Sequence, residues 1–178
     1  MYRHIARYCL LLGLTSLLVA CGFQLRGTDT SRTSFPEAWK TMYLVTSNPN
    51  GEFSRDLSAL FTANGVRWTE DGSANFSLVL GPDRFEQRNL SLNSEARVAE
   101  FELTMSSQFS VIDANKVQVM PETTVSVIKQ MENDPRNVVG KAGEMRLIQT
   151  EMRTELAEQI MRRISFYAAS SQSKPASP

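Results

Sequence analysis

Apolar and polar residues alternate along the chain from position 99 to position 111. One parity carries Ala99, Phe101, Leu103, Met105, Phe109 and Val111, and the other carries Glu100, Glu102, Thr104, Ser106, Gln108 and Ser110. This period of two predicts a long strand with one buried and one solvated face. Residues 113–116 predict a hairpin turn. On the returning strand Val117, Val119, Val125 and Val127 share a face, and Pro121, which lacks an N–H, favours an edge position or a bulge.

Shorter runs predict the remaining elements. The apolar run 42–45 predicts a first strand, which turn residues end at 48–51. A helical face then carries Phe53, Leu57, Leu60 and Phe61, and Asn64-Gly65 closes this helix as a C-cap pair. Alternating Phe76, Leu78 and Leu80 predict the next strand, which Gly81-Pro82 ends and the polar residues 84–92 continue as an exposed arm. After a loop from 133 to 143, a long helix carries one apolar stripe made of Met145, Ile148, Met152, Leu156, Ile160, Ile164 and Tyr167.

The order of these elements, β-α-β-β-β-α, predicts an α+β fold. A two-layer sandwich accommodates all the amphipathic surfaces: a four-stranded, mostly antiparallel sheet with two helices packed on one face. Because the first connection passes through a helix, we expect the first two strands to be parallel, with a right-handed crossover.

The N-terminus has the order of a secretory signal. Arg3, His4 and Arg7 precede an apolar run at 9–20, which is shorter than the ~20 residues that span a bilayer. The junction Leu18-Val19-Ala20-Cys21 resembles a bacterial lipobox, in which the cysteine is lipidated and becomes the first residue; the alternative is an ordinary signal peptide with a cysteine near its cleavage site. Acylation at Cys21 by more than one chain would hold the protein firmly at a membrane. Gly22, where an aspartate would favour the inner membrane, favours the outer one.

These features divide the chain into four parts. Residues 1–20 are a lipoprotein signal peptide, 21–38 the lipidated N-terminus and a polar tether, 39–169 a single domain, and 170–178 a disordered tail.

Composition narrows the function. The chain has 19 Lys and Arg and 19 Asp and Glu, so removal of Arg3 and Arg7 with the signal leaves a formal charge of −2, which argues against a nucleic-acid partner. The one histidine, His4, and one of the two cysteines, Cys9, lie in the signal, and Cys21 is the acylation site. The mature domain therefore has no histidine-dependent nucleophile and no sulfur or histidine metal site, and we expect a protein without cofactor that is not an enzyme.

Basic residues gather near the predicted loops: Arg84, Arg88, Arg97, Arg136 and Lys141. They could contact a phosphorylated ligand, because guanidinium and ammonium groups match phosphate oxygens, or they could be ordinary solvated charges. The polar parity of the long strand could likewise face a partner or water.

Four motifs in order resemble the LptE family, the lipopolysaccharide-assembly lipoproteins of Gram-negative outer membranes. They are Cys21-Gly22-Phe23-Gln24-Leu25-Arg26; Asn48-Pro49-Asn50-Gly51 with Ser54-Arg55 and Asn64-Gly65-Val66; Ala99-Glu100-Phe101; and Asp134-Pro135 with Lys141 and the closing helix. The resemblance spans about residues 18 to 168.

The resemblance implies an α/β sandwich that plugs the β-barrel LptD, supports its assembly and helps to insert lipopolysaccharide into the outer leaflet. It implies a lipid anchor at the periplasmic face, with the domain inside the barrel. It also implies lipopolysaccharide binding through basic residues at loop ends: Lys141 matches one position, and Ser94 stands at the other with Arg97 shortly after it. Among the basic loop residues, Arg136 is a further candidate contact.

Two alternatives belong to other classes. A periplasmic lipid carrier or transporter accessory lipoprotein would need an apolar groove for acyl chains, and a closed core would count against it. A cell-wall hydrolase would need a pocket with two converging carboxylates.

Overall fold

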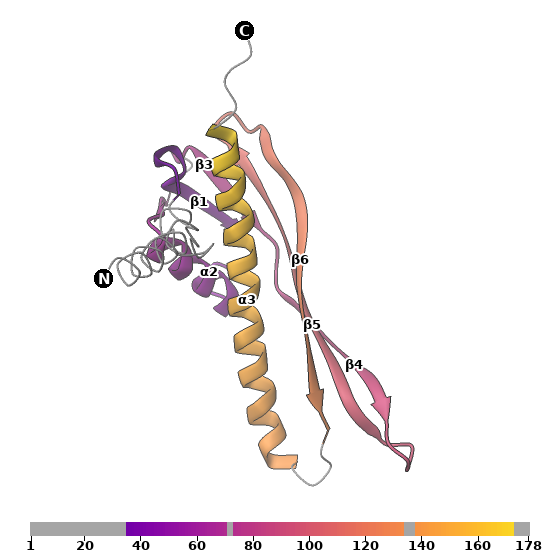
Figure 1. Cartoon of the computed structure of the whole chain (residues 1–178). Coiled ribbons are helices and arrows are strands. Elements are labelled where there is room, and N and C mark those ends of the chain that lie inside the picture. Colours follow the sequence, from indigo (N-terminus) through magenta and orange to yellow (C-terminus); the bar gives the residue numbers. More distant parts are fainter. Residues whose placement is uncertain (1–34, 71–72, 134–137, 173–178) are drawn as a thin grey trace, which may run out of the picture. The chain divides into compact units, whose positions relative to one another are not determined.

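The computed structural model describes residues 35–70, 73–133 and 138–172, which belong to one compact unit (Figure 1). The predicted signal peptide, Cys21, Arg136 and the last six residues lie outside the described residues. The elements in chain order are η2 (Glu37–Trp39), β1 (Thr41–Thr46), α2 (Glu52–Ala63), β2 (Arg67–Trp68), β3 (Phe76–Leu80), β4 (Arg84–Leu92), β5 (Val98–Asp113), β6 (Gln118–Glu132) and α3 (Val138–Gln172).

Strand β5 is the spine of a mixed six-stranded sheet. Along one edge it pairs antiparallel first with β4 and then with β3, and along the other edge it pairs with β6 over nearly its whole length. Strand β1 runs parallel to both β2 and β3. The α+β class and the parallel pairing of the first two predicted strands are confirmed, whereas the prediction of four mostly antiparallel strands is wrong.

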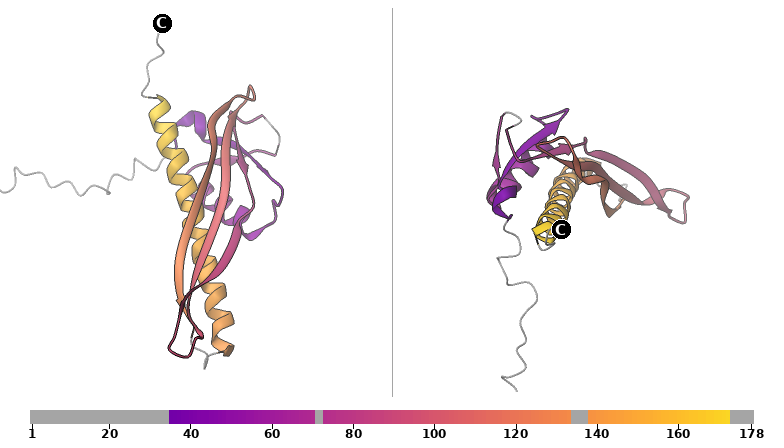
Figure 2. Two further views of the ribbon diagram at one scale, coloured as in Figure 1. Left: turned by 90° about the vertical axis from the view of Figure 1, so that its right-hand side faces the viewer. Right: turned by 90° about the horizontal axis from the view of Figure 1, so that it is seen from above.

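Helix α3 covers one face of the β5–β6 hairpin, and α2 packs beside it (Figures 1 and 2). With 35 residues α3 is about 52 Å long, and the 15–16 residues of β5 and β6 span about 50 Å. One helix therefore matches the length of the hairpin. Seen from above, the sheet curls around α3 (Figure 2).

The core lies between this helix and the sheet. Met152, Leu156, Ile160 and Ile164 of α3 meet Leu103, Met105 and Phe109 of β5, and all of them are almost fully buried. Both periodic stripes predicted for these elements are confirmed, with Met145, Ile148 and Tyr167 only partly covered at the two ends of the helix.

Helix α2 ends in the predicted cap. Asn64 is the C-cap, and Gly65 follows at φ +90°, a left-handed conformation that favours glycine. The N–H of Gly65 donates to the carbonyl of Thr62, and the N–H of Val66 donates to the carbonyl of Phe61, both at 3.0 Å. This pair of bonds is a Schellman motif, and the buried Phe61 and Val66 side chains provide its apolar contact.

The buried face of β6 differs from the one that the sequence predicts. Val125 and Val127 are buried, but Val117 is 57% exposed, and Met120 is buried in place of Val119. The register of β5 and β6 shifts beside Pro121, which moves the inward parity by one residue. The prediction for Pro121 is confirmed on both counts, because the strand is bulged there and, among the strands that the structure describes, β6 pairs with β5 alone.

The ends of the folded domain also differ from the predicted boundaries. Phe35 is almost fully buried and Trp39 stacks on Phe76 with ring centroids 3.8 Å apart, so the domain includes residues predicted as tether. Helix α3 begins at Val138, inside the predicted loop, and continues to Gln172, past the predicted start of the tail.

Candidate ligand-binding site

Lys141, in the second turn of α3, is held at the end of the sheet by residues from two strands. Its ammonium lies 4.3 Å from the centroid of the Phe101 ring on β5, and it donates a hydrogen bond to the side-chain oxygen of Asn133, which directly follows β6. We call Lys141, Asn133 and Phe101 the lysine cradle.

Asn133 is itself fixed by two further hydrogen bonds. Its backbone N–H donates to the carbonyl of Ala99 at 2.8 Å, and its side-chain Nδ2 donates to the carbonyl of Val98 at 2.7 Å. Because the amide nitrogen is used on the strand side, the amide oxygen faces Lys141. The start of β5 therefore determines where the cation lies.

The cradle leaves the lysine able to bind an anion. An ammonium group has three N–H donors; Asn133 accepts one, and the ring of Phe101 offers its negative face. Lys141 is only half-buried, so the remaining donor capacity is accessible from solvent. No carboxylate is paired with Lys141 within the described residues.

Arg97 occupies the turn between β4 and β5 at the same end of β5. Asn93 Oδ1 accepts from the N–H groups of Glu95 and Arg97, and Ala96 has φ +60°. The Arg97 guanidinium is exposed and lies 3.3 Å from Glu95. Arg97 precedes Phe101 by four residues, about 13 Å along a strand. The structure thus brings Arg97 and Lys141 to one end of the sheet, but Arg97 is not part of the cradle.

Other basic side chains are engaged in ion pairs. Arg88 lies 2.7 Å from Glu102 across the β4–β5 pair, and this hydrogen bond raises the pKa of the guanidinium above its ordinary value. Lys129 of β6 lies 2.6 Å from Glu155 and 3.0 Å from Glu151, which tie the strand to α3 and raise the pKa of the ammonium.

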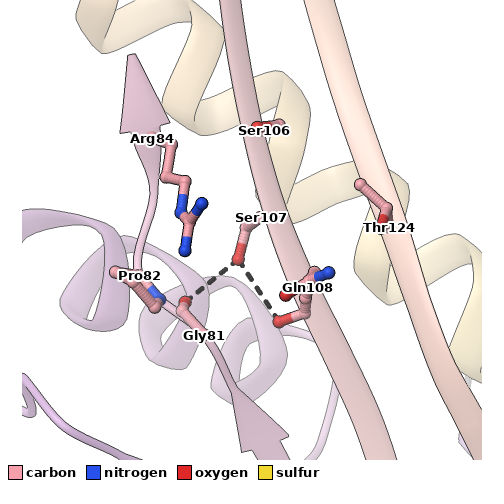
Figure 3. A pocket seen from close by; sticks show the side chains of 7 residues that line it. All are labelled: Gly81, Pro82, Arg84, Ser106, Ser107, Gln108 and Thr124. Atoms are coloured by element: carbon pink, nitrogen blue, oxygen red, sulfur yellow. Dashed lines mark hydrogen bonds between the residues drawn. The ribbon is translucent and has the colours of Figure 1, made fainter.

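A second polar feature lies where β3 ends and β4 begins. A small pocket is lined by Gly81, Pro82, Arg84, Ser106, Ser107, Gln108 and Thr124 (Figure 3). Figure 3 shows the Arg84 side chain directed towards Ser107 and Gly81, with both helices behind the sheet. Ser107 donates to the carbonyl of Gly81 at 3.0 Å.

Sequence reasoning proposes Lys141 and Arg97 as ligand contacts but does not predict which residues surround them. The sequence predicts Asn133 only as the start of a loop, and Phe101 as a buried strand residue within a family motif, with no role in holding a cation for either. An amide side chain directly after a strand is the one local signal for the cradle, and it is weak, because Asn is common in loops generally. Arg136 lies outside the described residues.

Two observations on the described residues bear on the alternative functions. Leu103, Leu156 and Ile160 have no exposed surface, so the space between α3 and the sheet is a filled core rather than an acyl groove. The polar pocket is lined by no carboxylate. Within the described residues, no helix has the length and apolar content needed to cross a membrane.

Comparisons with known proteins agree on one family. The model of the LptE family, described as lipopolysaccharide-assembly, matches residues 39–164. The LPS-assembly lipoprotein LptE of Photorhabdus laumondii is 31% identical over 162 residues, covering 87% of this chain and 83% of the relative. The protein of the same name from Pectobacterium atrosepticum is 26% identical over 160 residues, covering 88% and 84%.

Solved structures show the same fold. The crystal structure of the rare lipoprotein B from Shewanella oneidensis has a TM-score of 0.66 at 27% identity, covering 74% of this chain and 98% of that one. The solution structure of lipoprotein B from Nitrosomonas europaea has a TM-score of 0.70 at 20% identity, covering 84% and 94%.

Proposed function

The chain belongs to the LptE family of lipopolysaccharide assembly, and from this premise we propose that it binds lipopolysaccharide as an outer-membrane lipoprotein. Its partner is the β-barrel LptD, whose lumen the domain plugs and whose assembly it supports. Acyl chains on Cys21 anchor it at the periplasmic face of the outer membrane. The task is binding and positioning, without a catalytic group.

The lysine cradle is the observation that supports ligand binding. A cation held beside a fixed amide and an aromatic ring has lost much of its conformational freedom before a ligand arrives, which lowers the entropic cost of binding. Phosphate groups of lipopolysaccharide are strong acceptors for such an ammonium. Arg97, in the turn at the same end, and Arg136 are the further contacts we propose.

This chemistry suggests how the protein acts on its ligand. Lipopolysaccharide molecules aggregate through cations that bridge their phosphates. A protein ammonium that pairs with one phosphate replaces a bridging cation at that point, because both compete for the same oxygens. Binding at the cradle therefore loosens the aggregate and presents single molecules to the barrel.

The polar face of the sheet supports the proposed barrel partner. Outside the polar pocket, the β5 face that points away from α3 carries Thr104 and Ser110, and the adjoining β6 face carries Ser126. Short hydroxyl side chains on a solvated sheet can hydrogen-bond with the polar residues that line a barrel lumen.

Lipopolysaccharide binding by a charge-reversal variant tests the ligand site. We expect Lys141→Asp to weaken binding by roughly tenfold, equivalent to about 1.4 kcal/mol. Lys116→Asp is the matched control: it makes the same charge change in the β5–β6 turn, where Lys116 has φ +66°, a conformation that aspartate tolerates. Equal affinities for the two variants, with normal thermal melting of both, would reject Lys141 as a ligand contact.

Extraction of the native protein tests the anchor and the partner. Mass spectrometry should find acyl chains on an N-terminal Cys21, and mild detergent should co-purify a large β-barrel protein. An unmodified N-terminus or release into periplasmic washes would refute the anchor. Absence of the barrel from the extract would refute the partnership.

A further inference from the structure

The pocket beside Arg84 lies at a break in the sheet. The ladder of β3 and β5 ends at Leu80 and Phe109, and that of β4 and β5 begins at Arg84 and Ser106. Between them residues 81–83 face residues 107–108, so one strand carries an extra residue. The backbone of Gly81 approaches Gln108 so closely that a Cβ would lie 3.1 Å from its carbonyl oxygen. The pocket is therefore built into the sheet.

The residues that line the pocket carry several hydrogen-bond donors, and none of them carries a carboxylate. The Arg84 guanidinium offers N–H groups in a fixed fork, the Ser106 and Thr124 hydroxyls can donate, and the Gln108 amide adds two donors. The Ser107 hydroxyl already donates to Gly81, so it shapes the pocket rather than binding a ligand.

Two of the nearby carboxylates, Asp83 and Glu102, are paired with other guanidinium groups. Asp83, next to Arg84 in the chain, lies 3.8 Å from Arg153 of α3. Glu102, on the same face of β5, is paired with Arg88. Arg84 has no ion-pair partner among the described residues, although it lies in a concave site where a counter-charge would be well placed.

We propose that this pocket is an anion-binding subsite for one oxygen-rich group, a phosphate ester or a sugar carboxylate, held by the Arg84 fork with help from Ser106, Gln108 and Thr124. Planar bidentate recognition of such groups is the geometry in which arginine outperforms lysine. Under the proposed function, on which this extension rests, the group belongs to the saccharide part of lipopolysaccharide.

The subsite is separate from the lysine cradle. Ser106 follows Phe101 by five residues on β5, about 17 Å along a strand. Phe101 belongs to the parity buried under α3, and Ser106 to the opposite parity. The two sites thus contact different anionic groups.

Titration with inorganic phosphate tests the subsite itself. In the mature lipidated protein in a sugar-based detergent, backbone NMR signals of Ser106, Gln108 and Thr124 should shift on adding phosphate, and not with chloride at equal ionic strength. Arg84→Gln should abolish the shifts, and Arg84→Lys should leave weaker ones. Arg163→Gln, an exposed change of equal charge on α3, should leave them intact. The proposed subsite would be refuted if the signals of the pocket residues did not shift with phosphate in the wild-type protein. It would also be refuted if they shifted by the same amount in Arg84→Gln.

Lipopolysaccharide binding tests its biological ligand. We expect Arg84→Gln to weaken affinity about three- to tenfold while Arg163→Gln does not. If Lys141→Asp weakens binding and Arg84→Gln does not, the glycolipid assignment of the pocket fails while the proposed function stands. If the wild-type protein binds no lipopolysaccharide, the proposed function fails. The phosphate titration by itself then shows whether the pocket binds an anion. A photocrosslinker at Gln108 should capture glycolipid; capture of the barrel protein alone would show that a protein wall covers the pocket and would overturn the assignment.

Discussion

Replacing Asn133 with alanine tests whether the lysine cradle is a structural unit. The change removes the bond from Nδ2 to the carbonyl of Val98 and the bond from Lys141 to Oδ1, while the backbone bond to Ala99 remains. Each lost side-chain bond contributes about 1 kcal/mol, with the charged one discounted because Lys141 is partly exposed. We therefore expect Asn133→Ala to lower the free energy of unfolding by about 2 kcal/mol. For a mature chain of this size that corresponds to about 4–8 °C in Tm.

A second substitution separates stability from ligand binding. Asn133→Asp keeps an acceptor for Lys141 but loses the donor to Val98, so stability should also fall. The new carboxylate pairs with the ammonium and offsets its charge, whereas alanine leaves the charge in place. Lipopolysaccharide affinity should thus fall about tenfold in Asn133→Asp and only about two- to threefold in Asn133→Ala, which loses the orientation of Lys141 but keeps its charge.

A double-mutant cycle with Lys141→Met gives the refuting result. Urea unfolding of the wild type, both single variants and the double variant isolates the interaction between the two side chains. We expect a coupling energy of about 1 kcal/mol. A coupling near zero would mean that the bond between Lys141 and Asn133 does not form in solution. Equal lipopolysaccharide affinities for Asn133→Ala and Asn133→Asp would mean that the ammonium does not contact the ligand.

Three further changes test other parts of the domain by urea unfolding. Arg153→Met should cost about 1–3 kcal/mol, because it removes the guanidinium that joins Glu52 of α2 to Asp83; an unchanged midpoint would contradict that link. Ala96→Gly should stabilise the domain by about 0.5–1 kcal/mol, because it relieves the φ of +60° before Arg97, and a lower midpoint would show that the turn adopts another conformation. Hydrogen bonds from Lys129 to Glu155 and Glu151 raise the folded pKa of Lys129 above its unfolded value. The stabilisation from this cluster is therefore fully present below the unfolded pKa of about 10.4 and is lost as pH rises through the folded pKa. The stability difference between wild type and Lys129→Met should stay constant from about pH 7 to 9 and shrink above about pH 10.5, and a difference that grows in alkali would refute the pairing.

The elements that could be predicted from sequence are those with one buried and one wet face. Burial of one face gives the sequence of β5 an apolar period of 2 and that of α3 an apolar period of about 3.6, so both buried faces can be predicted. Strand β4 lacks that signal: seven of its nine residues are exposed, and only Phe85 and Ser91 are partly covered. A strand that is exposed on both faces forms because a neighbouring strand hydrogen-bonds with it, and no local sequence pattern reveals that neighbour. The sequence therefore predicts an exposed arm here rather than a strand of the sheet.

The register of β6 was beyond sequence reasoning for a related reason. Pro121 indicates that an irregularity occurs, because it has no N–H for the ladder. It does not indicate that the inward parity changes there, from Met120 before the bulge to Val125 after it. Grouping four valines by spacing alone assumed a regular strand, and Val117 consequently lay on the wrong face.

The candidate site shows the same division. Lys141 and Arg97 were predicted from the resemblance to a family, but the contacts that orient them depend on tertiary register. Asn133 and Lys141 are eight residues apart, on either side of a segment between strand and helix. Phe101 reaches them only because β5 and β6 pair from Glu100 and Glu132 onward. The β5–β6 hairpin brings these three side chains together, and the local sequence around each of them does not indicate that they meet.

The exposure of the β4 arm, which is strand β4 with the turn that joins it to β5, explains how the domain can serve both the proposed partner and the proposed ligand. Helix α3 packs on β5 rather than on β4. Backbone pairing with β5 holds the arm, together with two polar contacts: Arg88 to Glu102 at 2.7 Å, and the Ser91 hydroxyl to Glu100 at 2.7 Å. Each such contact contributes little in water, because solvent competes for both groups. The arm therefore lies at the low-stability end of the fold, and it carries Arg97 in its turn and Arg84 at its base. A surrounding barrel wall would exclude water from these pairs and strengthen them, so the arm gains order where the proposed partner needs it, while the helix–sheet core keeps its own stability without the partner.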